Sequence, residues 1–279
     1  MSICAAWVPS HITGFFAAMR QDDPVKSGSI GCGLALALGA TTFVQAAAET
    51  AIVLNGQVSD APVSRFVVDR LARSPVRVET KLDMPFGSGF GASGAGSLGC
   101  AHALNAYFDL GLTANQAAAF AHEAEVTNRT GLGDVIGQHT GGLVIRIRPG
   151  APGIGEVDRI PVPPLPVDYV VRGPISTKEV LSDQAVMKAV NAAGVEALKE
   201  LLRRPTLQDF MRLARHFTRQ SGLASDWTSD AIEAVEAAGG MASMIMLGDA
   251  VFAFGGAAAL AEFGEVHTTT ISQRGANLD

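Results

Sequence analysis

The sequence has 279 residues, of which 48% are hydrophobic and 17% are charged, a mixture typical of a folded globular protein and not of a disordered chain. Its formal net charge of −6 argues against a protein that binds nucleic-acid backbones, because such binding needs a basic surface to displace counterions. Three widely spaced cysteines form no CxxC pair, which argues against a disulfide framework or a cysteine-built zinc site and favours a reducing cytoplasm.

The segment from Ser27 to Ala48 carries no charge and is long enough to span a bilayer. It is interrupted by glycines, serines and threonines and lacks a dense block of Leu, Ile or Phe, so we do not interpret it as a transmembrane helix. The start of the chain also lacks the basic and apolar regions of a secretory signal. We therefore expect a soluble, cytoplasmic protein with no membrane partner.

Short apolar or alternating runs predict the strands of the first half, and alanine-rich runs predict its helices. The clearest alternation is that of Val76, Val78, Thr80 and Leu82, which is typical of a half-buried strand. The predicted strands cover residues 4–8, 41–49, 51–54, 77–82 and 142–148, and the predicted helices cover residues 94–108 and 113–127.

Proline and glycine separate this half from the next. The stretch from Pro149 to Gly155, followed by the prolines between Pro161 and Pro166, can sustain neither a helix nor a central strand. We therefore predict two domains, residues 1–160 and residues 161–279. Strands and helices mix without a regular βαβ alternation, so the predicted fold class is α+β.

Long amphipathic patterns dominate the second half. Ser176 and Glu179 have the S-x-x-E spacing of a capping box, in which the two side chains satisfy free amides at the start of a helix. We predict a helix from this point to about residue 203. The remaining predicted elements are helices over residues 206–220 and 230–238 and strands over residues 168–171, 241–247 and 266–271.

The most informative motif is Pro85-Phe-Gly-Ser-Gly-Phe-Gly-Ala-Ser-Gly-Ala95, between a predicted strand and a predicted helix. Its alternating glycines let the backbone curl and bring its amides close to an anion, and the helix that follows directs its N–H groups and dipole to the same place. The motif therefore predicts a polyphosphate-binding loop, with a glycine-rich turn without a ligand as the alternative. It lacks the G-K-[ST] ending of a Walker loop and the βαβ context of a dinucleotide fingerprint.

The spacing P-x-G-x-G-x-G-x-S-x-A of this loop resembles the second motif of the GHMP kinases, the family of galactokinases, homoserine kinases and mevalonate kinases. Mevalonate kinases have a glutamate, an aspartate eleven residues later and then a pair of glycines. In this chain Glu123 is followed at the same distance by Asp134 and then by Gly141 and Gly142. The loop and this spacing together favour the family.

The opening of the chain sharpens the resemblance. Trp7-Val-Pro-Ser-His-Ile-Thr-Gly-Phe-Phe16, with Asp23-Pro-Val-Lys-Ser-Gly-Ser29, is similar to the start of the archaeal pantoate kinases, a branch of that family. The chain departs from the branch at Ser10, where a glycine is typical, and at Ile30, where a basic residue is typical. The family's third motif has only a loose counterpart in residues 238–256.

The resemblance implies a two-domain GHMP kinase fold, with an N-terminal domain like domain 2 of ribosomal protein S5 and a ferredoxin-like C-terminal domain. It implies a kinase that uses ATP and Mg²⁺ to phosphorylate the primary hydroxyl of D-pantoate to 4-phosphopantoate in archaeal coenzyme A biosynthesis. Two alternatives stay open: a kinase of this fold for another small alcohol, of the homoserine or mevalonate type, and a non-catalytic ATP-binding sensor. The sequence does not fix the oligomeric state, and a homodimer is one alternative.

The resemblance also implies roles for residues of the first domain. Ser93 and Glu123 would hold Mg²⁺, for which oxygen donors are suitable, whereas Glu125 is expected to be an ordinary exposed carboxylate. Asp134 would be the general base that accepts the proton of the attacking hydroxyl. The ATP phosphates would be bound by Gly87, Ser88, Gly89, Gly91, Ala92 and Ser93.

The acceptor site is expected near the start of the chain. His11 stands where many family members have a catalytic lysine, so it is assigned a catalytic and acceptor-binding role, with a buried structural histidine as the alternative. The complete set expected to bind the acceptor is His11, Lys26, Ser27, Gly28, Ser29 and His139.

Overall fold

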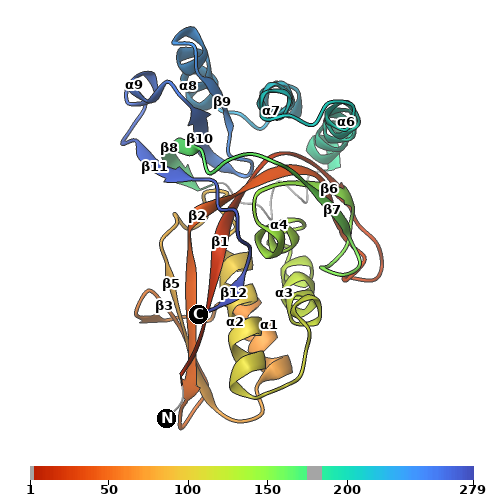
Figure 1. The fold of residues 1–279 in the computed structure, drawn as a ribbon, viewed down its shortest axis with the longest axis vertical. Coiled ribbons are helices and arrows are strands. Elements are labelled where there is room, and N and C mark those ends of the chain that lie inside the picture. The colour runs from red at the N-terminus through yellow and green to blue at the C-terminus, as the bar shows by residue number, and fades with distance from the viewer. Residues whose placement is uncertain (1–2, 175–183) are drawn as a thin grey trace.

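The computed structural model describes residues 3–174 and 184–279, and the predicted capping box at Ser176 and Glu179 lies outside these ranges. Within them, the strands form an eight-stranded sheet and a four-stranded sheet, and helices cover both, as the α+β prediction requires. The two sheets build two lobes, one above the other in Figure 1. We call the lobe with the eight-stranded sheet the N-terminal lobe and the other the C-terminal lobe.

Two long antiparallel strands form the centre of the N-terminal lobe. β1 (Cys4–Met19) and β2 (Gly28–Ala46) pair along nearly their whole length, with register shifts between Pro9 and Ser10 and between Thr13 and Phe15. Strand predictions at 4–8 and 41–49 therefore captured only the outer ends, because the bulges and glycines break the simple alternation on which the prediction relied. The uncharged segment that begins at Ser27 is mostly strand β2.

The other strands of this sheet flank β1 and β2. The sheet order is β12-β1-β2-β5-β3-β4, and β6 pairs with β2 and with β7. β5 follows the outer half of β2, at Ala40–Ala46, and β6 follows its inner half, at residues 31–34. The bounds are β3 (Ala51–Leu54), β4 (Gln57–Val58), β5 (Val76–Leu82), β6 (Leu143–Arg148), β7 (Glu156–Ile160) and β12 (Asn277–Leu278).

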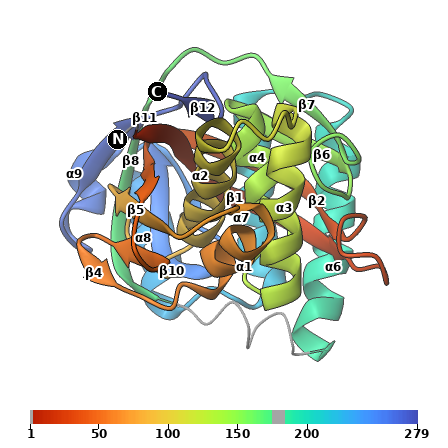
Figure 2. The same ribbon diagram turned by 90° about the horizontal axis from the view of Figure 1, so that it is seen from below.

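Four helices cover one face of this sheet, and α1, α2 and α3 lie side by side in Figure 2. They are α1 (Pro62–Leu71), α2 (Ala92–Tyr107), α3 (Ala114–Asn128) and α4 (Asp134–Thr140). α2 consists largely of alanine, glycine and serine, which lets it approach the sheet closely: a Cβ on Gly99 would lie 2.6 Å from Oγ1 of Thr42. α1 and α4 were not predicted, because α1 is only ten residues long and α4 is a seven-residue helix among glycines.

The C-terminal lobe has the sheet order β11-β8-β10-β9. Its strands are β8 (Pro166–Pro174), β9 (Met241–Met244), β10 (Gly248–Phe254) and β11 (His267–Thr270), and its helices are α6 (Gln184–Leu201), α7 (Leu207–Ser221), α8 (Asp226–Ala237) and α9 (Ala257–Leu260). The strand predicted over 241–247 was wrong in its second half, which is the turn of the β9–β10 hairpin. In that turn Leu247 has a φ of 65°, a conformation for which the expected sequence signal is glycine.

Aromatic side chains join the two lobes. Phe15 of β1 packs against Phe210 of α7, with ring centroids 6.2 Å apart, and Phe16 packs against Phe217 at 5.9 Å. A Cβ on Gly14 would lie 2.6 Å from the Phe210 ring, so the glycine lets α7 approach β1. The hydrophobic core therefore continues from one lobe into the other.

The chain passes from the first sheet to the second between β7 and β8. We propose the boundary between the two domains at this point, near residue 160, with one exception: strand β12, at the end of the chain, returns to pair with β1, with Trp7 opposite Asn277. The N-terminal domain would thus include the last residues of the chain.

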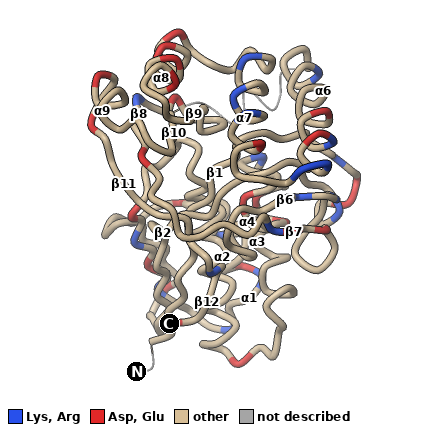
Figure 3. The backbone as a smooth tube through the Cα atoms, turned by 45° about the horizontal axis from the view of Figure 1, so that its top comes forward, with Lys and Arg blue, Asp and Glu red and all other residues tan. Residues whose placement is uncertain are grey.

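Charged residues of both signs lie on the helices of the C-terminal lobe, with arginines along α7 and Asp and Glu along α8 (Figure 3). Ion pairs connect these helices: Arg215 and Arg219 of α7 pair with Glu236 of α8, and Arg212 pairs with Glu200 of α6. Among the helices of the described ranges, none combines the length and the apolar composition needed to cross a bilayer.

Candidate active site

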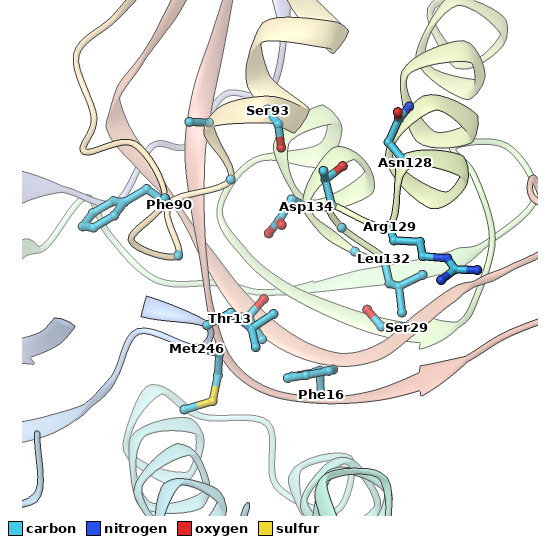
Figure 4. Close-up of a pocket in the computed structure, with 18 of the residues that line it drawn as sticks. Thr13, Phe16, Ser29, Phe90, Ser93, Asn128, Arg129, Leu132, Asp134 and Met246 are labelled. Atoms are coloured by element: carbon cyan, nitrogen blue, oxygen red, sulfur yellow. The ribbon is translucent and has the colours of Figure 1, made fainter. Parts of the chain in front are cut away.

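A cavity of about 340 Å³ lies where the two lobes meet, which is a size suited to small-molecule ligands. Five parts of the chain line it: the glycine-rich loop and the start of α2, the inner halves of β1 and β2, the connection from α3 to α4, strand β6, and the β9–β10 turn (Figure 4). Its lining residues include Thr13, Phe16, Ser29, Phe86, Gly87, Gly89, Phe90, Gly91, Ala92, Ser93, Asn128, Arg129, Leu132, Asp134, Arg146 and Met246.

The glycine-rich loop forms one wall of the cavity. Gly87, Gly89 and Gly91 have φ values of 76°, 84° and 66°, in the region where glycine has no steric penalty. α2 begins directly after Gly91, so its first N–H groups have no partner inside the helix and are available to an anion. Of the six residues predicted to bind phosphate, Ser88 does not belong to the lining set, because its side chain is buried.

Asp134 stands at the start of α4 and reaches the cavity with its carboxylate, whose exposed fraction is 25%. His11 of β1 lies behind it, with Nδ1 2.8 Å from Oδ1 of Asp134. The His11 side chain is fully buried, does not line the cavity, and has Nε2 3.4 Å from Nη1 of Arg146. The predicted contact between His11 and the acceptor is therefore wrong, because both ring nitrogens already face protein groups.

Arg146, which sequence analysis did not identify, lies on β6 at the floor of the cavity and is 1% exposed. Its Nη2 donates to Oγ1 of Thr13 at 3.4 Å, and its Nε has no hydrogen-bond partner among the described residues. Burial lowers the pKa of Arg146, and the negative charge of Asp134 opposes this effect. A signal was present in the sequence: Arg146 stands between two isoleucines in an otherwise apolar run of β6.

The two glutamates of α3 lie in the reverse of the expected positions: Glu125 is buried, and Glu123 is partly exposed. Glu123 pairs with Arg70 of α1 at 3.3 Å, on the outside of the lobe. Glu125 is 2% exposed; it lies beside Ser93, and its Oε1 accepts a 2.7 Å hydrogen bond from Thr130. Residues two positions apart in a helix are about 200° apart around its axis, so only one of the two glutamates can lie beside Ser93. The predicted pairing of Glu123 with Ser93 is therefore wrong, and the carboxylate beside Ser93 is that of Glu125.

Burial raises the pKa of Glu125 to about 7; the charge of Asp134 also raises it, whereas hydrogen bonds to Thr130 and Ser93 lower it. Its Oε2 has no hydrogen-bond partner within residues 3–174 and 184–279. A Cβ on Gly131 would overlap this oxygen, so the glycine leaves room for the Glu125 carboxylate. Helical periodicity could have found Glu125, which follows Ala118 and Ala121 on the buried face of α3.

Of the six residues predicted to bind the acceptor, all of which the structure describes, Ser29 alone lines the cavity. Lys26 is 59% exposed and pairs with Asp23 in the β1–β2 connection. The carbonyl of Ser27 accepts a hydrogen bond from His122, and Gly28 packs against Gly150. These residues are close to Ser29 in sequence, but the β1–β2 connection carries them away from the cavity.

His139 also lies outside the cavity. Its Nε2 is 2.9 Å from Oδ1 of Asn115, and its ring lies parallel to that of His102. His139 lies five positions after Asp134, which places the two side chains on different faces of α4. The prediction that it faces the acceptor is therefore wrong.

Residues 58–142 match the sequence profile described as the GHMP kinases N terminal domain. With a two-lobed α+β fold and a glycine loop opposite a carboxylate, this match defines the class: a small-molecule kinase that uses ATP. The pantoate kinase of Thermococcus kodakarensis is 40% identical over 89% of this chain and 86% of its own length. That of Methanospirillum hungatei is 34% identical over 97% and 94%. The chain therefore belongs to the GHMP kinase family, in its pantoate kinase branch.

Solved structures support the same family and fold. One described as a phosphotransferase related to the CoA biosynthesis pathway has a TM-score of 0.91 and 33% identity and covers 100% of this chain and 99% of its own. A homoserine kinase from Cytophaga hutchinsonii has a TM-score of 0.70 at 15% identity, covering 100% and 98%, and shares the fold. The family resemblance and the fold expected from the sequence are both confirmed.

Proposed function

We propose that this protein is a pantoate kinase, which transfers the γ-phosphoryl group of ATP to the primary hydroxyl of D-pantoate and releases 4-phosphopantoate and ADP. The relatives named pantoate kinase, which match 88% to 97% of the chain, support this assignment. In the cavity, one observation carries the choice of an acid as acceptor: the buried Nε–H of Arg146 has no protein partner among the described residues. A buried cation with a free donor is a suitable seat for a carboxylate.

The surroundings of Arg146 fit the rest of the acceptor. A Cβ on Gly133 would lie 2.8 Å from Nε of Arg146 and would overlap Oγ of Ser29, so glycine keeps a side chain away from the two donors. The acceptor carboxylate would bind them from the cavity. Phe16 and Leu132 lie beside Ser29 in Figure 4 and offer apolar contacts to the two methyl groups of pantoate. The hydroxyl at the other end of the acceptor would then point toward Asp134.

The phosphates of ATP would lie along the glycine-rich loop, held by its amides and by the first N–H groups of α2. Ser93 and Glu125 fit a magnesium ion: both offer oxygen, and Oε2 of Glu125 is buried without a protein partner in the described chain. When bound, the ion would neutralise charge on the phosphates. Ser93 and Glu125 together would hold it next to the start of α2.

Transfer needs little covalent chemistry from the protein, because positioning and charge stabilisation supply most of the catalysis. Asp134 would accept the proton of the acceptor hydroxyl. At the same time the hydroxyl oxygen would form a bond to the γ-phosphorus, and the bond between the γ-phosphorus and the bridging oxygen of ADP would break. Arg146 would fix the other end of the acceptor. The contacts between the lobes, from Phe16 and Met246, would keep water from the phosphoryl group.

The test is ADP release by the purified protein with Mg-ATP and one acceptor at a time: D-pantoate, L-homoserine, mevalonate or none. We expect release with D-pantoate alone, and 4-phosphopantoate as the product by mass spectrometry. Release with homoserine or mevalonate in its place would overturn the acceptor and keep the kinase. Tight ATP binding without turnover of any acceptor would favour the sensor alternative.

A further inference from the structure

Two glycines enclose the ring of His11, which is fully buried. A Cβ on Gly33 of β2 would lie 2.6 Å from its Nε2, and a Cβ on Gly137 of α4 would lie 2.5 Å from the same atom. Both distances are too short for a real Cβ, so glycine is needed on each side of the ring. The backbone N–H of His11 also donates to the carbonyl of Phe90 in the glycine-rich loop, at 3.1 Å. The imidazole therefore has a fixed place between the base and the loop.

The neighbours of the ring determine where its proton lies. The nitrogens of a guanidinium only donate hydrogen bonds, so Nε2 of His11 is the acceptor of the 3.4 Å contact with Nη1 of Arg146. The single proton of the ring is then on Nδ1, which donates to Oδ1 of Asp134 at 2.8 Å. A second proton on Nε2 would face the positive charge of Arg146. The imidazole is thus neutral and is in one tautomer.

We propose that His11 is the positioning residue of the catalytic base: it occupies Oδ1 of Asp134 through Nδ1–H and so leaves Oδ2 as the atom that takes the proton of the acceptor hydroxyl. The chain Arg146–His11–Asp134 connects the group that binds the acceptor carboxylate to the group that removes its proton. An acceptor seated on Arg146 is thereby aligned with the base. The inference rests on the proposed function, specifically on Asp134 as the base.

Two substitutions of His11 separate the two halves of its role. In His11→Asn the amide nitrogen takes the place of Nδ1 and keeps a donor to Asp134, while the acceptor for Arg146 is lost. In His11→Gln the amide reaches the place of Nε2 instead, and the donor to Asp134 is lost. We expect kcat to fall about 100-fold in His11→Gln and less than about 10-fold in His11→Asn, with the KM for ATP unchanged in both. His139→Gln, on the same helix as Asp134 but outside the cavity, is the matched control and should stay within about two-fold of wild type.

The wild-type protein supplies a second test that does not depend on the variants folding. In the NMR spectrum of ¹⁵N-histidine-labelled protein, the signals of His11 are those that disappear in His11→Asn. These signals should show a protonated Nδ1 and an unprotonated Nε2, unchanged from pH 6 to 8. A protonated Nε2, or an imidazolium, would overturn the inference.

The kinetic outcomes also distinguish the inference from the function on which it rests. Equal losses of kcat in His11→Asn and His11→Gln, with Asp134→Asn inactive, would overturn the positioning role and keep the base. Full activity of Asp134→Asn would overturn the base, and the role of His11 with it. A 10-fold or greater difference between the two His11 variants, in the stated order, would support the inference.

Discussion

Gln138 donates a 2.8 Å hydrogen bond from Nε2 to the carbonyl oxygen of Gly91, the last residue of the glycine-rich loop before α2. Gln138 lies four residues after Asp134 on α4, so one short helix carries the proposed base and also holds the phosphate loop. A displacement of α4 would therefore change the position of both groups together. This coupling explains why a seven-residue helix, too short to be stable alone, has a defined place in the lobe.

Replacing Gln138 by Met keeps the shape of the side chain and removes the hydrogen bond to Gly91. The carbonyl of Gly91 then keeps only its hydrogen bond from the amide of Ala95, so α4 no longer holds the loop; we expect the KM for ATP to rise about 10-fold, with the KM for D-pantoate unchanged. Steady-state kinetics with each substrate varied in turn will measure this. Thr140→Val is the control, because it removes a hydrogen bond within α4, to Ile136, and does not touch the loop. Equal shifts in the two variants would show a general effect on the helix.

Glu125→Gln and Glu123→Gln form a matched pair on one helix. If Glu125 holds the magnesium ion with Ser93, its replacement should lower kcat on the order of 100-fold and raise the Mg²⁺ concentration needed for half-maximal rate. Glu123 takes part only in a partly exposed ion pair with Arg70, so its replacement should stay within about two-fold. Initial rates over a series of Mg²⁺ concentrations will decide, and the reverse order of effects would restore the assignment made from spacing.

The loop could be predicted from the sequence because its signal is local. Gly87, Gly89 and Gly91 are close together, and their conformations are set by the same few residues that form the helix start. Asp134 lines the cavity, and it was identified from its distance to Glu123, although the glutamate beside Ser93 is Glu125. A spacing counted along the chain does not show which side of a helix a residue faces, whereas the pattern of buried alanines does.

Arg146 could not be placed in the site by the same reasoning. It reaches His11 and Thr13 across the sheet, more than a hundred residues away in the chain, and only the pairing of β6 with the inner half of β2 brings them together. The prediction that Lys26 binds the acceptor failed for the opposite reason: Lys26 is only three residues from Ser29, yet its side chain is exposed to solvent. Residues close to Ser29 in sequence were predicted to bind the acceptor with it, but the β1–β2 connection places them away from the cavity.

Arg146→Lys tests the proposed binding of the acceptor carboxylate to Arg146. Lysine keeps the charge but lacks the Nε–H donor and the planar geometry of the guanidinium, so we expect the KM for D-pantoate to rise about 100-fold. ATP binding, measured by calorimetry without acceptor, should not change. Arg148→Lys, two residues further on the same strand and 66% exposed, should leave both quantities unchanged. An unchanged KM for D-pantoate in Arg146→Lys would mean that the carboxylate binds elsewhere.

His102 gives the fold a predictable weakness in acid. It is 7% exposed on α2, and burial lowers its pKa to about 4, with the neighbouring His139 adding to the effect. In the unfolded chain its pKa is about 6.5, so the unfolded state binds a proton that the folded state does not, and stability is lost as the pH falls from about 6.5 toward 4. Between pH 7.5 and 4.5 this group should cost roughly 2 to 3 kcal/mol of unfolding free energy. Urea unfolding at the two pH values measures how much unfolding free energy is lost in acid. This loss should be smaller by that amount in His102→Leu than in wild type. It should not change when the exposed His216 is replaced by Leu. An equal acid loss in wild type and His102→Leu would mean that other groups cause the acid sensitivity.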